Sequence, residues 1–215
     1  MIPKIQLALD CSSLEEAIKD CQNGVVDEVD ILECGYSLIA AEGARVVKVF
    51  REMFPDKSLV ADFKIVDAGS KIGGMLLDGK PDYTTILCAC EKGTITSVKK
   101  EVEKRNLKTE LQMELYGHWS FDDIPMWIES GIDQLTLQHS GDLPGTWTKE
   151  EIEVLKKLSE YDVKICAAGA IGIDELELFK DIPVDTFIFG RAIRGAQNPA
   201  LMAKQIKEKI KTIWK

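Results

Sequence analysis

The chain has 215 residues, of which 45% are hydrophobic, and it carries a formal net charge of −9 at pH 7. This length suffices for one sizeable core, the acidic balance argues against a broad nucleic-acid-binding surface, and no apolar run approaches the roughly 20 residues of a membrane span. Because the N-terminus enters a strand-like segment without a signal-peptide pattern, we expect one cytoplasmic domain over residues 1–215, with neither nucleic acid nor membrane as partner.

Short β-rich segments alternate with longer amphipathic segments along the chain. Strands are predicted at residues 5–9, 29–32, 59–63, 83–87, 110–115, 134–137, 164–167 and 186–189. Helices are predicted at residues 14–21, 43–54, 69–77, 94–105, 121–130, 149–159, 174–179 and 199–213. Eight alternating units predict a single-domain α/β fold, the (β/α)₈ TIM barrel, with a doubly wound open sheet as the alternative.

A charged cluster follows the third predicted strand. Asp62, Lys64 and Asp67 have the spacing D-x-K-x-x-D. Because strand side chains alternate between faces, we expect Asp62 and Lys64 to project together from the end of the strand and Asp67 to lie in the following turn. Neighbouring carboxylates keep a lysine protonated, so that it can stabilise an anion or deliver a proton. The alternative interpretation is a solvated surface ion pair.

Polar residues and glycines recur where the predicted strands end. In chain order they are Asp10, Glu33, Asp62 with Lys64, Cys88, Glu114, Gln138 with His139, Gly169, and Gly190 with Arg191. Catalytic groups of TIM barrels lie at the carboxyl ends of the strands, so this repetition predicts a shared pocket. The glycine turns after strands seven and eight are typical of phosphate-binding loops, and Arg191 adds charged hydrogen bonds. We therefore expect a phosphorylated metabolite as the ligand.

Five segments together resemble the orotidine 5′-monophosphate decarboxylase suprafamily. They are Leu-Ala-Leu-Asp at 7–10, Val-Asp-Ile-Leu-Glu-Cys-Gly at 29–35, the run at 61–69, Glu-Leu-Tyr-Gly-His-Trp at 114–119 and Phe-Ile-Phe-Gly-Arg-Ala-Ile-Arg at 187–194. The resemblance spans essentially the whole chain. It is greatest to the branch of 3-keto-L-gulonate 6-phosphate decarboxylases, with 3-hexulose-6-phosphate synthases second.

The resemblance implies a Mg²⁺-dependent decarboxylation of 3-keto-L-gulonate 6-phosphate to L-xylulose 5-phosphate, through an enediolate and in a homodimer. It implies that Glu33 and Asp62 hold Mg²⁺ and that Lys64 stabilises the enediolate. Asp67 would reach across the dimer interface into the partner's site. Hard oxygen ligands such as these two carboxylates suit Mg²⁺ better than zinc.

The same resemblance assigns the remaining site residues. Asp10 would bind substrate hydroxyls, and Glu114 would complete the polar wall of the pocket. The phosphate would be bound by Arg191 and by the backbone of Ala170 and Gly190.

The sixth strand departs from the decarboxylase pattern, which has a histidine at its end and an arginine three residues later. Here these positions hold Gln138 and Gly141, and His139 is displaced by one position. Strand alternation predicts that His139 leaves on the helix face, unless a bulge or early turn swings it inward. Glutamine cannot act as a general acid, although it can position a water, and His118 is a further candidate for the acid.

Two alternatives to decarboxylation therefore stay open. One is aldol chemistry that joins formaldehyde to ribulose 5-phosphate and uses the same enediolate. The other is a barrel that binds sugar phosphates but has impaired turnover. The complete set of Glu33, Asp62, Lys64 and Asp67 argues against the second, because a binding protein has no need of a lysine among carboxylates.

Overall fold

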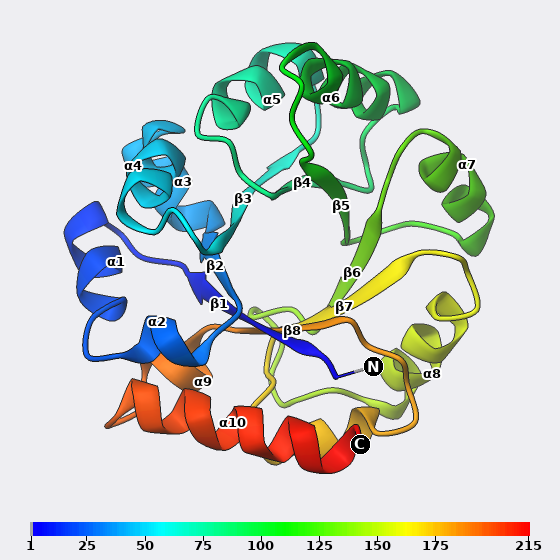
Figure 1. Ribbon diagram of the computed structural model, residues 1–215. Helices are drawn as coiled ribbons and strands as arrows, with labels where there is room; N and C mark the ends of the chain where they lie inside the picture. Colours follow the sequence, from blue (N-terminus) through cyan, green and yellow to red (C-terminus); the bar gives the residue numbers. More distant parts are fainter. Residues whose placement is uncertain (1) are drawn as a thin grey trace.

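Eight short apolar segments form the strands of a closed parallel barrel in a computed structural model that describes residues 2–215 (Figure 1). The strands are β1 (Lys4–Leu9), β2 (Ile31–Cys34), β3 (Ser58–Ile65), β4 (Tyr83–Leu87), β5 (Glu110–Leu115), β6 (Gln134–Gln138), β7 (Lys164–Ala168) and β8 (Thr186–Phe189). Each strand pairs with the next along the chain, and β8 closes on β1 with Lys4 opposite Thr186. The predicted TIM barrel is confirmed.

Helices surround the barrel as an outer ring (Figure 1). They are α1 (Leu14–Asp20), α2 (Val25–Glu28), α3 (Tyr36–Glu42), α4 (Arg45–Met53), α5 (Gly69–Leu77), α6 (Lys92–Lys104), α7 (Ile124–Glu129), α8 (Lys149–Leu158), α9 (Arg191–Arg194) and α10 (Pro199–Ile213), with 3-10 helices η1 (Phe121–Asp123) and η2 (Glu175–Phe179). Several begin at side-chain caps, because Ser13, Thr148 and Asn198 each accept a bond from an N–H of the first turn.

Several predicted elements differ from the structure in extent or in type. The segment 43–54 is preceded by the unpredicted helix α3, and Gly43, at φ 76°, separates α3 from α4. The segment 174–179 forms the 3-10 helix η2 rather than an α-helix. The second strand begins two residues later than predicted, so Glu33 lies within β2 and faces the barrel interior with Gln6, instead of following the strand.

The barrel separates an apolar layer from a polar interior. Leu7, Leu32, Leu59 and Leu111 belong to the hydrophobic core between strands and helices. Inside the barrel, amide and carboxyl side chains bond to one another instead, and the pairs are Gln6 with Glu33, Gln112 with Gln134 and Gln134 with Glu110. Buried polar groups require hydrogen-bond partners, and these pairs supply them. Polar and charged side chains can therefore fill the barrel interior as far as the carboxyl ends of the strands.

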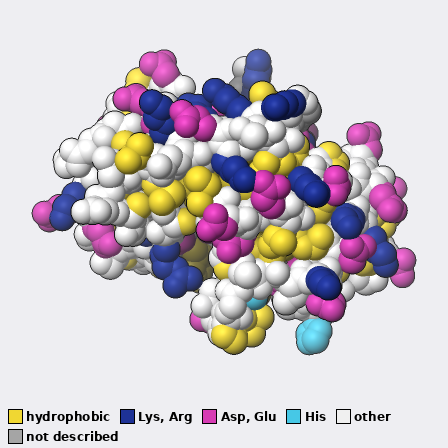
Figure 2. All heavy atoms as spheres, turned by 90° about the horizontal axis from the view of Figure 1, so that it is seen from below, with side chains coloured by type: hydrophobic (Ala, Val, Ile, Leu, Met, Phe, Trp, Pro, Cys, Tyr) yellow, Lys and Arg dark blue, Asp and Glu magenta, His cyan; other side chains and the backbone are white. Residues whose placement is uncertain are grey.

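The side of the molecule that carries α10 has charges of both signs. Figure 2 shows Lys and Arg side chains interspersed with Asp and Glu there. One partly exposed pair, Lys207 with Glu28 at 3.6 Å, joins α10 to α2. Exposed pairs contribute little stability, so the packing of α10 depends on buried residues such as Ile206 and Ile210. No helix within residues 2–215 combines the length and the apolar character that crossing a bilayer requires.

Candidate active site

A cavity of about 530 Å³ opens at the carboxyl ends of the barrel strands. Its lining includes all the catalytic, substrate-binding and metal-binding residues expected from the sequence except Asp67 and the further candidate His118, and Cys88, just after β4, also lies outside it. Carboxylates enter it from β2, β3 and β5, and the glycine turns and Arg191 enter it from β7 and β8. The cavity therefore has an acidic side with one lysine and an opposite side suited to an anion.

The third strand is irregular where Asp62 and Lys64 lie. Ala61 is opposite Thr84 and Ile65 is opposite Ile86, so three residues of β3 stand against the single residue of β4 between them. Lys64 takes a φ of 51°, which is uncommon for a residue other than glycine. Its Nζ lies 2.9 and 2.8 Å from the two carboxylate oxygens of Asp62. The two side chains project together as predicted, but a bulge places them rather than regular alternation.

The lysine is held between two buried carboxylates. Glu114 Oε2 lies 3.7 Å from Lys64 Nζ, and Asp62 and Glu114 are each only 4% exposed. Burial lowers the pKa of Lys64, but the charges of Glu114 and Asp62 outweigh it and raise the pKa above its ordinary value. Lys64 is therefore a protonated donor directed into the cavity. The interpretation as a solvated surface ion pair is wrong, because the two carboxylates beside the lysine, Asp62 and Glu114, are buried.

The acidic side of the cavity has an excess of negative charge. Burial raises the pKa of Glu33 well above its ordinary value, and the charges of Asp62 and Asp10 raise it further. Gln6 Nε2 stabilises Glu33 by donating a hydrogen bond of 2.6 Å to Oε2. Four carboxyl groups share this region with the single ammonium of Lys64. An added cation that binds carboxylate oxygens would relieve their repulsion, so Glu33 and Asp62 fit a divalent ion such as Mg²⁺.

Glu114 makes the stability of the metal-free protein depend on pH. Burial raises its pKa from 4.5 to about 7, although the charge of Lys64 opposes the shift. The folded state therefore holds a proton that the unfolded state releases, and the free energy of unfolding falls as pH rises from 4.5 through about 7. We expect the Tm of the metal-free protein to be lower at pH 8 than at pH 5, and to change less in Glu114→Gln. Equal changes in both proteins, measured by thermal unfolding, would contradict this.

The turn after β7 is fixed by close packing. Gly169 has a φ of 77°, and a Cβ at this position would lie 2.0 Å from the carbonyl oxygen of His139. Trp147 Nε1 donates to the Gly169 carbonyl at 2.7 Å, and Thr146 Oγ1 donates to the Ala170 carbonyl at 2.9 Å. These contacts hold the turn at the edge of the cavity, where backbone N–H groups can meet a phosphate.

The sixth strand presents an amide to the cavity. Gln138 is half-buried and lines it. His139 is only 3% exposed, its Nδ1 lies 3.0 Å from Glu151 Oε1 at the start of α8, and its Nε2 is buried. The Nδ1 side of the ring therefore faces α8, while His139 also belongs to the lining of the cavity. His118 is exposed and lies outside the cavity lining.

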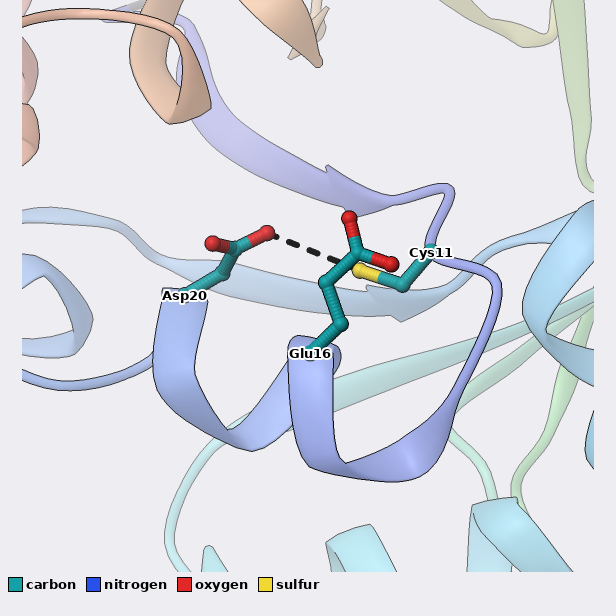
Figure 3. Close-up of side chains that lie close together, drawn as sticks. All are labelled: Cys11, Glu16 and Asp20. Atoms are coloured by element: carbon teal, nitrogen blue, oxygen red, sulfur yellow. Dashed lines mark hydrogen bonds between the residues drawn. The ribbon is translucent and has the colours of Figure 1, made fainter.

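Cys11, Glu16 and Asp20 form a cluster of three possible metal ligands at α1, with their ligand atoms within 4.8 Å of one another (Figure 3). Arg194 occupies it, because Nε donates to Asp20 at 2.5 Å and Nη2 donates to Glu16 at 3.2 Å and to Cys11 Sγ at 3.0 Å. The guanidinium already supplies the positive charge, so this cluster is a structural ion-pair network. Arg194 Nη1 also donates to the carbonyl of Asp10, which joins the network to the cavity.

Asp67 stands apart from the other predicted residues. It is exposed, lies in the turn after β3 and does not line the cavity of its own chain. The neighbouring Val66 and, on α5, Met75 are 48% and 52% exposed. Asp67 therefore lies on the surface, next to the exposed apolar side chain of Val66.

Four site residues were missed by the sequence interpretation. Tyr36 lines the cavity, and the centre of its ring lies 5.9 Å from Lys64 Nζ. It follows Glu33-Cys34-Gly35 at the end of a strand, so the pattern of strand ends could have predicted it. Gln6 and Thr85 lie within strands, and Arg194 lies on a helix of four residues. Nothing in a single sequence marks Gln6 and Thr85 as parts of a site, whereas Arg194 ends the segment 187–194 that carries the family resemblance.

Comparisons with known proteins agree with this fold. Residues 3–206 match the family "Orotidine 5′-phosphate decarboxylase / HUMPS family". The chain is 32% identical, over 99% of both chains, to the 3-keto-L-gulonate-6-phosphate decarboxylase UlaD of Salmonella paratyphi B. Similar solved structures include KGPDC of Streptococcus mutans (36% identity, TM-score 0.93, 100% of both chains) and 3-hexulose-6-phosphate synthase of Salmonella typhimurium (28% identity, TM-score 0.88, 98% of this chain and 99% of that one). The chain therefore belongs to the orotidine 5′-phosphate decarboxylase / HUMPS family.

Proposed function

We propose that this protein, a carbon–carbon lyase by its family, decarboxylates 3-keto-L-gulonate 6-phosphate to L-xylulose 5-phosphate. The observation that carries the proposal is the position of Lys64, protonated between Asp62 and Glu114 and directed into a cavity whose opposite side has glycine turns and Arg191. The relative named 3-keto-L-gulonate-6-phosphate decarboxylase, which is similar over its full length, supports the choice of substrate.

Substrate binding in this proposal uses the two sides of the cavity. The phosphate lies against the turns after β7 and β8, where Arg191 and the N–H groups of Ala170 and Gly190 bind it. Asp10, at the end of β1, accepts hydrogen bonds from sugar hydroxyls. Its carboxylate packs closely on Gly35, where a Cβ would lie 2.4 Å from Asp10 Oδ1. These contacts bring the keto acid end of the sugar to Lys64.

The bond changes follow from this placement. When the bond to the carboxylate breaks, its electron pair moves toward the adjacent carbonyl, CO₂ leaves, and an enediolate remains. The Lys64 ammonium stabilises the developing oxyanion. Mg²⁺ held by Glu33 and Asp62 would supply a Lewis acid that polarises this carbonyl. The carbon that lost CO₂ then takes a proton, which we assign to a water that Gln138 positions, because an amide cannot donate a proton itself.

The proposal includes a homodimer in which Asp67 enters the site of the partner chain. Its support is that Asp67 is exposed outside the cavity of its own chain and that the adjacent Val66 presents exposed apolar area. A two-fold axis through this surface would make the contact reciprocal, so each chain would contribute one Asp67 to the other site.

The amide on β6 favours a second candidate function. Addition of the enediolate of ribulose 5-phosphate to formaldehyde forms a carbon–carbon bond at the carbon that decarboxylation must protonate. This aldol reaction needs no proton at that carbon. A base must first remove the C1 proton of ribulose 5-phosphate, and the alkoxide formed from formaldehyde then takes up a proton, for which a water suffices. A similar solved structure is a 3-hexulose-6-phosphate synthase, which supports keeping this candidate.

Proton NMR in D₂O with Mg²⁺ tests the proposal and separates the two candidates. Decarboxylation of 3-keto-L-gulonate 6-phosphate should give L-xylulose 5-phosphate with one deuterium at C1. Ribulose 5-phosphate with formaldehyde should give little hexulose phosphate under the same conditions. Faster consumption of the second pair than of the keto acid would replace the decarboxylase assignment by the synthase.

A further inference from the structure

Thr85, in the middle of β4, makes three hydrogen bonds to the bulged part of β3. Its Oγ1 accepts from the backbone N–H of Phe63 at 3.1 Å and of Lys64 at 2.8 Å. The same hydroxyl donates to Asp62 Oδ1 at 2.7 Å. The side chain is only 1% exposed. One buried hydroxyl thus contacts all three residues of the bulge.

The bulge explains why such a contact is needed. Three residues of β3 stand opposite Thr85 alone, so the regular pairing between β3 and β4 is interrupted there. Buried N–H groups require partners, and here the hydroxyl of Thr85 takes the place of a strand carbonyl for two of them. A hydroxyl has two acceptor lone pairs and one donor hydrogen, and Thr85 uses all of them. Its hydrogen must therefore point at Asp62.

We propose that Thr85 is a positioning residue for the reaction. It holds the backbone of Lys64 at the unusual φ of 51° and fixes one oxygen of Asp62, so that the ammonium and the carboxylate keep their relative placement. Thr85 does not line the cavity and touches no substrate, so it acts only through Lys64 and Asp62. The kinetic part of this inference rests on the proposed function, whereas its structural part does not.

The adjacent residue offers a matched control. Thr84 is also fully buried in β4, but its hydroxyl makes a different contact, a bond of 3.2 Å to the carbonyl of Ala61. Thr84→Val and Thr85→Val remove the same group, one residue apart on the same strand, and create the same side chain. Thr85→Ser keeps the hydroxyl and removes only a methyl group. The comparison therefore isolates the hydroxyl that faces the bulge.

The experiment measures crystal structures and steady-state kinetics of the three variants. In Thr85→Val we expect the bulge to rearrange and Lys64 Nζ to leave Asp62. We expect kcat to fall about 100-fold, because misplacement of a catalytic group by about 1 Å can lower the rate by that factor. KM should change less than about threefold, since Thr85 touches no substrate. In Thr85→Ser and Thr84→Val the Lys64–Asp62 contact and kcat should stay within about threefold of wild type, since the groups that place Lys64 are kept. If Thr85→Val does not fold, Thr85→Cys, whose thiol is a weak donor and acceptor, should lower kcat at least about tenfold.

Three results would overturn the inference. They are an intact bulge with the Lys64–Asp62 contact in Thr85→Val, a loss of kcat in Thr84→Val as large as in Thr85→Val, and a Thr85→Cys enzyme as active as Thr85→Ser. A wild-type protein without decarboxylase activity would instead refute the proposed function. The crystal structures would still decide whether Thr85 places Lys64 and Asp62.

Discussion

Replacement of Lys64 by alanine is expected to lower kcat by about 10³-fold or more, because the developing oxyanion loses its protein-borne cation. The substitution also leaves Asp62 and Glu114 facing each other in a buried site without the charge that lies 2.8 and 3.7 Å from them. Binding of the phosphate should persist, since Arg191 and the turns after β7 and β8 lie on the opposite side of the cavity. The prediction is therefore a loss in kcat that greatly exceeds the loss in affinity.

Initial-rate kinetics and calorimetric titration with D-ribulose 5-phosphate measure the two effects separately. Lys204→Ala is the matched control, because it removes an exposed lysine on α10 that does not line the cavity. Wild-type kcat and affinity are expected for this control. A Lys64→Ala enzyme that retains a tenth or more of the wild-type kcat would remove Lys64 from the chemistry.

A mixture of two inactive variants is expected to regain activity. Asp67→Asn alone should be inactive if Asp67 serves the partner's site, as Lys64→Ala alone should be. In a mixed dimer, one site then carries both lesions and the other carries neither. Random exchange makes half of the dimers mixed, each with one intact site, so about one quarter of the wild-type activity should return.

Subunit exchange must be complete for this measurement. The two variants are unfolded together at equal concentration, refolded and assayed, and each variant treated alone in the same way provides the background. Activity no higher than the two backgrounds would show that Asp67 acts within its own chain or not at all. Size-exclusion chromatography of the mixture verifies that a dimer is present.

The barrel itself was predictable because the same rule repeats eight times along the chain. Segments such as 83–87, 110–115 and 186–189 are short, apolar and separated by amphipathic segments, and the structure has strands at these residues. Four-residue helices escaped prediction, since α2 and α9 are too short to show a helical period. The second strand was predicted to begin two residues too early, because Val29 and Asp30 fit the strand pattern as well as Glu33 and Cys34 do.

The cavity was predictable to a similar degree, for a related physical reason. Parallel strands of a closed barrel end at one rim, so residues that follow apolar runs come together there, as Asp10, Lys64, Glu114 and Arg191 do. Contacts that pass between strands were not predictable. The bond from Thr85 to the bulge depends on a register shift between β3 and β4, and no feature of the sequence separates Thr85 from the adjacent Thr84.

At the sixth strand, the residues of this chain differ from the pattern of the decarboxylases that it resembles. Alternation predicted that His139 would turn toward the helices, and its Nδ1 does contact Glu151 at the start of α8, but the residue also lines the cavity. Both Gln138 and His139 line the cavity, but His139 Nδ1 is engaged by Glu151, and Gln138 can orient a water but cannot donate a proton. The proposed decarboxylation therefore depends on a water for its last step.

The most direct test of the account is the rate of CO₂ release from 3-keto-L-gulonate 6-phosphate by the purified protein, with Mg²⁺ and with EDTA. The account predicts release that is fast with Mg²⁺ and is lost with EDTA, from a protein whose β6 provides only an amide. Equal rates with Mg²⁺ and with EDTA would contradict the role given to Glu33 and Asp62. No release in either condition, from folded protein that still binds D-ribulose 5-phosphate, would contradict the decarboxylase assignment itself.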